Sequence, residues 1–528
     1  MIFKQLCIDY IHLHKTLFFS YIVIASISYI VKVLITPMIY SNILDLKNSD
    51  NFLSIIKQIC FLWIIIGIIY IVKVRIENKL FPEFLSFVRQ RLFSLFLQKN
   101  KINFNESNVS SDITRILEVT RCMKDIFSMI CQLFIPLSIL TLCINGYFLY
   151  KVPLLGAINM ICNATIVTYT ISSYPSLVKS SNQRELQYMN MIKKLDENFN
   201  NLLNIYLNDQ VAQTIESNKK IEDEYSKIYK SQNQEVLSFI NKFKLINYIF
   251  AIVCIFLLYK HSNSKDFINI LLIFTFYIST LENISEDIPS FIMLMGNINN
   301  AQPFLEGVIY SDKDKKHISK FKGDINFDNI SFKYGDKYIF KNFSLDIKSN
   351  ERIGIMAQTG KGKSTLMKLL LNFYELEDGK IYLDGIDLKE INVDDVRKRI
   401  NYVNQKTFLF NDTIMNNMKY GNNASDETII NLLKKYDFLK VFKNDLNFMV
   451  DKNGMNISLG TQKVIFLVRG FLKECDIIIL DEPFSSIDQE TRTNVLKMID
   501  EETKGKTLIV ITHDLNGLET VLDKMIEL

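Results

Sequence analysis

Long apolar runs dominate roughly the first 300 positions of the chain, whereas the later positions have the mixed pattern of an α/β domain. A helix needs about 20 apolar residues to cross the hydrocarbon core of a membrane. Runs of about this length predict six spans, at about 16–42, 53–72, 126–150, 152–175, 245–259 and 267–288. We therefore expect an α-helical six-span membrane domain.

Basic residues indicate which side of the membrane each loop occupies. The segment 74–124 carries nine Lys or Arg residues, and 176–243 is also rich in them. The opposite loops are short, and their basic residues are Lys47, Lys151, Lys260 and Lys265. Positive charge stays on the cytoplasmic side, so we expect both termini and the two long loops to be cytosolic. The helical pattern of these loops predicts membrane helices that extend well beyond the bilayer.

Three charged residues within the spans each have two interpretations. Lys32 in the first span either lines a water-filled cavity or extends its amine to the membrane rim. Glu282 and Glu286 lie one helical turn apart. They either line a path for a cationic substrate or mark where the sixth helix leaves the bilayer, and we favour the second interpretation.

Composition excludes several classes of protein. The net charge of +4 is small for 528 residues, and no basic run provides a footprint for nucleic acid. The eight cysteines are scattered without a CxxC spacing, which indicates neither a zinc site nor a disulfide framework. The first residues are amphipathic and the apolar run that follows is too long for a cleavable signal peptide.

The second half contains a phosphate-binding loop. The strand pattern ERIGIM leads into AQTGKGKST and then into the helical pattern LMKLLLNFY, the strand–loop–helix context that such a loop requires. Backbone N–H groups of the loop and of the helix start face the phosphates. Lys363 would reach the β- and γ-phosphates and Ser364 would bind Mg²⁺. The full set assigned to ATP here is Thr359, Gly360, Lys361, Gly362, Lys363, Ser364 and Thr365. The first glycine of the pattern is replaced by Ala357, which restricts the loop entry.

A buried strand further along the chain ends in two carboxylates, in the sequence IIILDE. Asp481 fits the acid that holds Mg²⁺, and Glu482 fits the base that polarises the attacking water. An acidic turn after a core strand would be a structural explanation. Beside a phosphate-binding loop, the catalytic interpretation is the stronger one.

These motifs, in this order, resemble an exporter-type ABC half-transporter over nearly the whole chain. The resemblance implies ATP and Mg²⁺ as cofactors, and a P-loop (RecA-like) α/β ATPase domain with an antiparallel β subdomain. It places the membrane domain at 1–300, a linker at 301–320 and the ATP-binding domain at 321–528.

The resemblance also implies roles for residues outside the two main motifs. Tyr334 would stack on adenine, Gln405 would sense Mg²⁺ and contact the membrane domain, and His513 would contact the γ-phosphate. Residues 484–488 resemble the D-loop of the family. Segments near 105–115 and 205–213 would be coupling helices that dock on ATPase domains.

The signature motif departs from the family pattern LSGGQ. Ser458 and Gly460 are retained, but Leu459 replaces a glycine and Thr461 replaces the glutamine. A register that uses Gln462 as the motif glutamine fits worse. In such dimers the signature of one chain faces the ATP of the other. Active hydrolytic residues beside an altered signature therefore favour a heterodimer over a homodimer.

The expected function is ATP-driven transport by a dimer in a membrane. The alternative is a regulatory or nucleotide-gated membrane protein that binds ATP with little turnover. A soluble DNA-repair ATPase with related motifs is excluded by the apolar spans. Fold and motifs do not choose the substrate.

Overall fold

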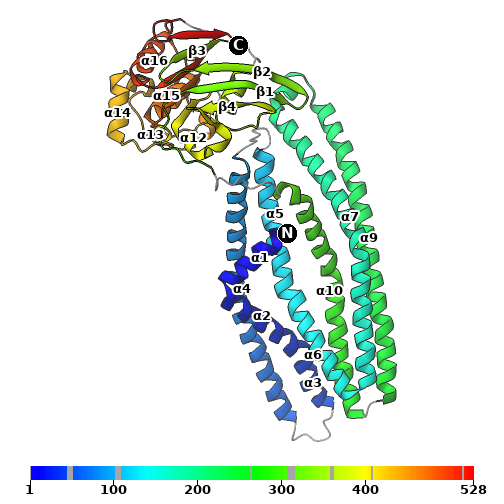
Figure 1. The fold of residues 1–528 in the computed structure, drawn as a ribbon. Coiled ribbons are helices and arrows are strands. Elements are labelled where there is room, and N and C mark those ends of the chain that lie inside the picture. Colours follow the sequence, from blue (N-terminus) through cyan, green and yellow to red (C-terminus); the bar gives the residue numbers. More distant parts are fainter. Residues whose placement is uncertain are drawn as a thin grey trace. The chain divides into compact units, whose positions relative to one another are not determined.

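The computed structural model describes residues 2–44, 52–101, 109–261, 264–305, 315–356, 362–405, 408–513 and 516–527. They form two compact units (Figure 1). The first comprises Met1–Leu97 and Ser107–Val308, and the second comprises Gln98–Glu106 and Ile309–Leu528. Each unit has its own hydrophobic cores.

The described residues of the first unit are almost entirely helical. The helices are α1 (Ile2–Leu13), α2 (Lys15–Ile30), the π-helix η1 (Val31–Ile35), α3 (Thr36–Leu44), α4 (Phe52–Lys99), α5 (Val109–Met129), the π-helix η4 (Ile130–Phe134), α6 (Ile135–Lys151), α7 (Pro153–Asn200), α8 (Leu202–Leu207), α9 (Val211–His261) and α10 (Ser264–Leu305). Among the described residues, six segments are long and apolar enough to cross a membrane, which confirms the predicted number of spans. As the loop patterns predicted, the helices run far past the apolar cores: α9, at 51 residues, contains the expected span 245–259.

Long helices α7 and α9 lie side by side over much of their length (Figure 1). Tyr169 of α7 stacks on Phe239 of α9, with ring centroids 5.3 Å apart. The short helix α8 connects the two and exposes Leu203, Tyr206 and Leu207. Its last residues, 205–207, overlap the region 205–213 expected for the second coupling helix. Residues 105–108 of the first such segment, 105–115, lie outside the described residues, and from Val109 onward the segment belongs to α5.

The charged residues within the spans have different surroundings. Lys32 lies exposed on η1. Glu286 of α10 pairs with Lys244 of α9, with the Lys244 Nζ 2.8 Å from the Glu286 Oε1. Glu286 is therefore neutralised by a neighbouring helix.

The second unit contains two sheets. The antiparallel sheet has the order β2-β1-β4-β5, formed by β1 (Ile325–Tyr334), β2 (Lys337–Ile347), β4 (Asp378–Leu383) and β5 (Ile386–Asp387). The parallel sheet has the order β6-β7-β8-β3-β9, formed by β3 (Arg352–Met356), β6 (Ile400–Val403), β7 (Ile477–Asp481), β8 (Thr507–Ile511) and β9 (Lys524–Glu527). Strands β7 and β8 are buried at every position. This agrees with their nearly continuous apolar runs, because a central strand of a parallel sheet is covered on both faces. The predicted α/β domain with an antiparallel β subdomain is confirmed.

Helices surround the parallel sheet and several are capped by short polar side chains. They are α11 (Lys363–Leu370), α12 (Val393–Arg399), α13 (Ile414–Lys419), α14 (Asp426–Lys435), α15 (Leu459–Leu472) and α16 (Gln489–Glu502), with 3₁₀ turns η5 (Leu388–Glu390), η6 (Leu439–Phe442) and η7 (Lys452–Gly454). Asn392, Thr413 and Asp488 each accept a hydrogen bond from a first-turn N–H of the helix that follows. Such caps fix where each helix begins.

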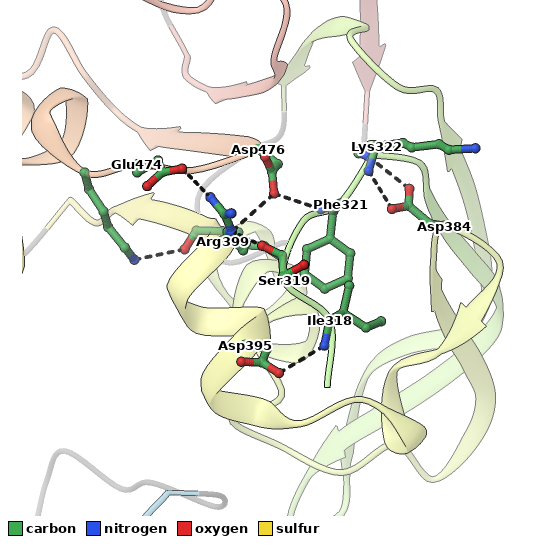
Figure 2. Close-up of polar contacts among 12 residues, drawn as sticks. Ile318, Ser319, Phe321, Lys322, Asp384, Asp395, Arg399, Glu474 and Asp476 are labelled. Atoms are coloured by element: carbon green, nitrogen blue, oxygen red, sulfur yellow. Dashed lines mark hydrogen bonds and ion pairs between the residues drawn. The ribbon is translucent and has the colours of Figure 1, made fainter. Parts of the chain in front are cut away.

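Carboxylates fasten the segment before β1 to the rest of the second unit (Figure 2). Asp395 accepts the N–H of Ile318, Asp476 accepts the N–H of Phe321, and Asp384 accepts the N–H of Lys322. Arg399 donates to the Ser319 carbonyl at 2.6 Å and pairs with Glu474 at 3.0 Å. This irregular segment therefore obtains from side chains the hydrogen bonds that a sheet would otherwise supply.

Candidate nucleotide-binding site

The phosphate-binding helix begins directly after a glycine with a left-handed backbone. Gly362 has φ +93° and is the N-cap of α11. A Cβ at this position would lie 2.6 Å from the Ile339 Cγ2 and 2.8 Å from the Phe340 Cζ. Only glycine fits without a shift of these side chains. The preceding residues Ala357–Lys361 lie outside the described residues, and so do the candidates Thr359, Gly360 and Lys361.

Ser364 and Asp481, the two expected Mg²⁺ ligands, lie within hydrogen-bond distance of each other. The Ser364 Oγ donates to the Asp481 Oδ2 at 3.1 Å, from the first turn of α11 to the end of β7. The Tyr402 hydroxyl donates to the same oxygen at 2.8 Å. Burial raises the pKa of Asp481, while the hydrogen bonds from Tyr402 and Ser364 lower it. A hydroxyl and a carboxylate are ligands that Mg²⁺ prefers, so this pair fits the ion.

Glu482 has an unusual backbone conformation, and its carboxylate has close charged or ionisable neighbours. Its φ of +48° is left-handed, which is rare for a non-glycine residue and is found at functional sites. Its N–H donates to the Ile511 carbonyl at 2.8 Å. The His513 Nδ1 lies 2.9 Å from the Glu482 Oε2, and the Lys363 Nζ lies 3.7 Å from the other carboxylate oxygen. The structure therefore brings two predicted site residues, Lys363 and His513, together around the buried carboxylate of Glu482.

Tyr334 and Gln405 lie apart from this cluster of polar contacts. The Tyr334 hydroxyl is 3.5 Å from the Thr365 Oγ1, and its ring contacts Phe332 and Tyr374 edge-on. Tyr334 is 44% exposed as a residue, which leaves a surface on which a base can stack. Gln405 is exposed just after β6, and the two residues that follow it lie outside the described part of the chain.

The signature segment begins helix α15. Ser458 is its N-cap and accepts the Thr461 N–H at 3.1 Å. A Cβ on Gly460 would lie 2.7 Å from the Ser486 carbonyl oxygen, so this glycine permits close packing on residues 484–488. Leu459 is 66% exposed at the helix start. Gln462 turns back and donates to the Gly454 carbonyl at 2.8 Å, so its amide holds the preceding loop.

Among the residues that support the two carboxylates, sequence reasoning missed two that contact Asp481. One is Tyr402, which bonds to Asp481 from β6. The other is Lys463, whose Nζ donates to the Asp481 main-chain carbonyl at 3.0 Å and which is only 4% exposed. Burial lowers the pKa of Lys463 to about 8, against the opposing effect of Asp481 and Glu482. The available signal was a single lysine at the start of the apolar run KVIFLV.

Comparisons with known proteins agree with this geometry. Residues 340–485 match the family described as ABC transporter. The "ATP-dependent lipid A-core flippase" of Francisella tularensis subsp. holarctica (strain OSU18) is 32% identical over 216 residues, which are 40% of this chain and 35% of the relative. The "ABC transporter ATM1" of Plasmodium falciparum (isolate 3D7) is 37% identical over 195 residues, which are 36% of this chain and 18% of the relative. The matched region is thus about a third or less of either relative.

The fold similarity extends over nearly the whole chain. A structure of "a bacterial Atm1-family ABC exporter with ATP bound" superposes with a TM-score of 0.82 at 17% identity, covering 98% of this chain and 93% of the other. The matched domain and the shared fold define a membrane protein with an ATP-binding domain of the ABC type. Residues 340–485 thus match the ABC transporter family, and the chain as a whole has the fold of that bacterial exporter. Its six candidate spans indicate a multi-pass integral membrane protein.

Proposed function

We propose that this chain is one half of a dimeric ABC exporter that couples ATP hydrolysis to the movement of a substrate across a membrane. The observation that carries the proposal is the convergence of Ser364 on Asp481 and of His513 on Glu482, at neighbouring positions after one strand. This arrangement provides metal ligands beside a positioned base, as ATP hydrolysis requires.

Each site residue has a proposed role. Lys363 binds the β- and γ-phosphates, while Thr359, Gly360, Lys361, Gly362 and Thr365 form the rest of the phosphate-binding loop. Ser364, Asp481 and Gln405 would hold Mg²⁺, and a bound Mg²⁺ would neutralise charge on the phosphates. Glu482 polarises the attacking water, His513 contacts the γ-phosphate, and Tyr334 stacks on adenine. Because the His513 Nδ1 is 2.9 Å from one Glu482 oxygen, His513 also limits the rotation of that carboxylate.

The dimer we propose is a heterodimer. Ser458 and Gly460 would face the ATP of the partner, with Leu459 beside them. Since Leu459 is largely exposed, its side chain would stand where a phosphate approaches the helix start. A partner with an intact signature would complete the site of this chain, and the altered segment 457–461 would cap a partner site that only binds ATP. A homodimer with a tolerant signature is the alternative.

The exposed apolar tip of α8 fits the coupling role proposed for the region 205–213. Leu203, Tyr206 and Leu207 are each more than 60% exposed. Apolar side chains gathered at a cytosolic helix tip indicate a protein contact. The tip would dock on an ATPase domain and transmit its movement to α7 and α9.

Hydrolysis in proteoliposomes tests the proposal. The full chain, alone and with candidate half-transporters, is reconstituted and its ATPase activity is measured beside that of Glu482→Gln. We expect Mg²⁺-dependent turnover that Glu482→Gln lowers by at least about a hundredfold, because a general base is lost, while ATP binding persists. Nucleotide binding without turnover in every combination would favour the alternative function, a nucleotide-gated or regulatory membrane protein.

A further inference from the structure

Tyr402, the penultimate residue of β6, lies on the same face of the parallel sheet as Asp481. Strands β6 and β7 pair in parallel, with Tyr402 opposite Ile479. Side chains alternate between the two faces of a strand, so Tyr402, Ile479 and Asp481 share one face. The Tyr402 ring packs against the hydrophobic core that contains Ile479 and, from α11, Leu366. This packing holds the ring where its hydroxyl reaches the end of β7.

Two hydroxyl groups from different elements converge on one oxygen of Asp481. The Tyr402 hydroxyl donates to the Asp481 Oδ2 at 2.8 Å, and the Ser364 Oγ donates to the same atom at 3.1 Å. The Tyr402 hydroxyl also lies 3.2 Å from the Asn404 Oδ1. A phenol has one proton to donate, and a carboxylate is a stronger acceptor than an amide. Asp481, at the shorter distance, is therefore the main acceptor.

The hydrogen bonds to Oδ2 determine where the other oxygen of the Asp481 carboxylate lies. None of the described residues donates a hydrogen bond to that oxygen, Oδ1. Because a carboxylate is planar, fixing Oδ2 from two directions limits the rotation of the whole group. Ser364 is itself an expected ligand of Mg²⁺, whereas Tyr402 is not. Tyr402 is therefore the donor that can hold the acid while Ser364 engages the ion.

We infer that Tyr402 is a positioning residue for the divalent cation of this site. Its hydroxyl fixes the orientation of the Asp481 carboxylate and thereby sets how tightly the site binds Mg²⁺. Partners that hold a metal-binding carboxylate typically contribute about 10–100-fold to metal affinity. The inference rests on the proposed function for the presence of ATP and Mg²⁺ in the site. Its test measures binding, so the two can fail separately.

Binding of Mn²⁺, a paramagnetic probe of the Mg²⁺ site, provides the test by electron paramagnetic resonance. The full chain in detergent carries Glu482→Gln, which removes the proposed base, and is in excess over ATP so that little free nucleotide binds Mn²⁺. Tyr402→Phe deletes the hydroxyl and keeps the packed ring. We expect the dissociation constant of Mn²⁺ to rise at least about tenfold. The dissociation constant of ATP without a divalent cation should be the same in both chains.

Tyr436 provides a matched control. It is buried, and its hydroxyl donates to the carboxylates of Glu501 and Glu502 at 3.0 and 2.6 Å, on α16 rather than at the end of β7. Tyr436→Phe should lower the thermal stability of the chain and leave the dissociation constant of Mn²⁺ unchanged. If Tyr402→Phe does not fold, 4-fluorophenylalanine at position 402 fills the space of the hydroxyl without donating a proton, and the same loss is expected.

The outcomes separate the inference from the proposed function. Equal Mn²⁺ binding with and without the Tyr402 hydroxyl would overturn the inference, even in a chain that hydrolyses ATP. Equal losses in Tyr402→Phe and Tyr436→Phe would also overturn it, because they would show a general effect on folding. A chain that retains Tyr402 and binds no Mn²⁺ would do the same. Mn²⁺ binding that weakens in Tyr402→Phe, in a chain that shows no turnover when Glu482 is restored, would sustain the inference and refute the proposed function.

Discussion

The Nζ of Lys463 lies 3.0 Å from the main-chain carbonyl oxygen of Asp481, and both residues are buried. The bond joins the first turns of α15, the helix of the signature segment, to the end of β7, where the two site carboxylates lie. A buried lysine is unfavourable unless its ammonium group has a partner. Here its partner is the main-chain position from which Asp481 and Glu482 extend.

Replacement of Lys463 should impair turnover more than stability. In Lys463→Met the Asp481 carbonyl loses its donor, a change of roughly 1–3 kcal/mol, and the end of β7 is less firmly held. We expect kcat for ATP to fall by about tenfold with little change in KM, as for a residue that positions catalytic groups. Steady-state ATPase assays of the full chain would measure this.

Lys473 offers a matched control for that substitution. It follows α15, and burial lowers its pKa as well, but its Nζ donates to the Arg397 carbonyl at 2.6 Å, away from the carboxylates. Lys473→Met should lower thermal stability and leave kcat unchanged. Equal losses of kcat in the two variants would contradict a positioning role for Lys463.

The lowered pKa of Lys463 predicts how stability depends on pH. Below pH 8 the lysine is charged in both the folded and unfolded chain, and burial of its charge fully opposes folding. Between about pH 8 and 10.5 the folded chain releases the proton while the unfolded chain retains it, so the free energy of unfolding rises with pH. The shift from 10.5 to about 8 corresponds to a contribution on the order of 3 kcal/mol.

The difference in Tm between the wild-type chain and Lys463→Met isolates this contribution from the other titrating groups. Measured in detergent from pH 7.5 to 9.5, the Tm of the wild-type chain should rise relative to that of Lys463→Met. A difference that stays constant over this range would show that Lys463 releases no proton there.

The sequence predicted the elements whose local pattern is strong. Six apolar runs predicted six spans, and the strands that end at Met356 and Asp481 followed from short apolar runs beside recognisable loops. Lys463 and Tyr402 were not predicted, because their contacts with Asp481 join residues 18 and 79 positions apart and arise only when α15 and β6 pack beside β7. A local pattern contains no information about such pairings.

Asn163 illustrates the same limit. It looks like one of many asparagines in the sequence. In the structure its side-chain oxygen accepts a hydrogen bond from the hydroxyl of the buried Tyr277, 114 positions later.

Gly362 should be essential for nucleotide binding for two separable reasons. Alanine at this position would strain a backbone with φ +93° and would place its Cβ 2.6 Å from the Ile339 Cγ2. Displacement of the start of α11 moves the Lys363 and Ser364 side chains, so Gly362→Ala should weaken ATP binding at least about tenfold. Gly385→Ala is the control, since Gly385 has φ +78° with nothing within 4 Å of an added Cβ. It should strain the backbone without affecting the dissociation constant of ATP, and similar weakening in both variants would exclude the steric explanation.

Repair of the signature segment should distinguish the heterodimer from a tolerant homodimer. Leu459 is 66% exposed at the start of α15, where the N–H groups of a helix terminus face an approaching phosphate. In a homodimer of the isolated chain, each ATP would meet this leucine, and hydrolysis should be slow. The double substitution Leu459→Gly and Thr461→Gln should then raise the turnover of the isolated chain at least about tenfold, because both sites gain a competent cap.

Within a heterodimer, the same repair should leave hydrolysis at this chain's own site unchanged, since the partner's signature completes that site. ATPase assays of the isolated chain and of co-purified pairs, each with Glu482→Gln as the control for this chain's own site, would measure both effects. Full cooperative hydrolysis by the isolated unmodified chain, with two equivalent sites, would rule out the asymmetric arrangement.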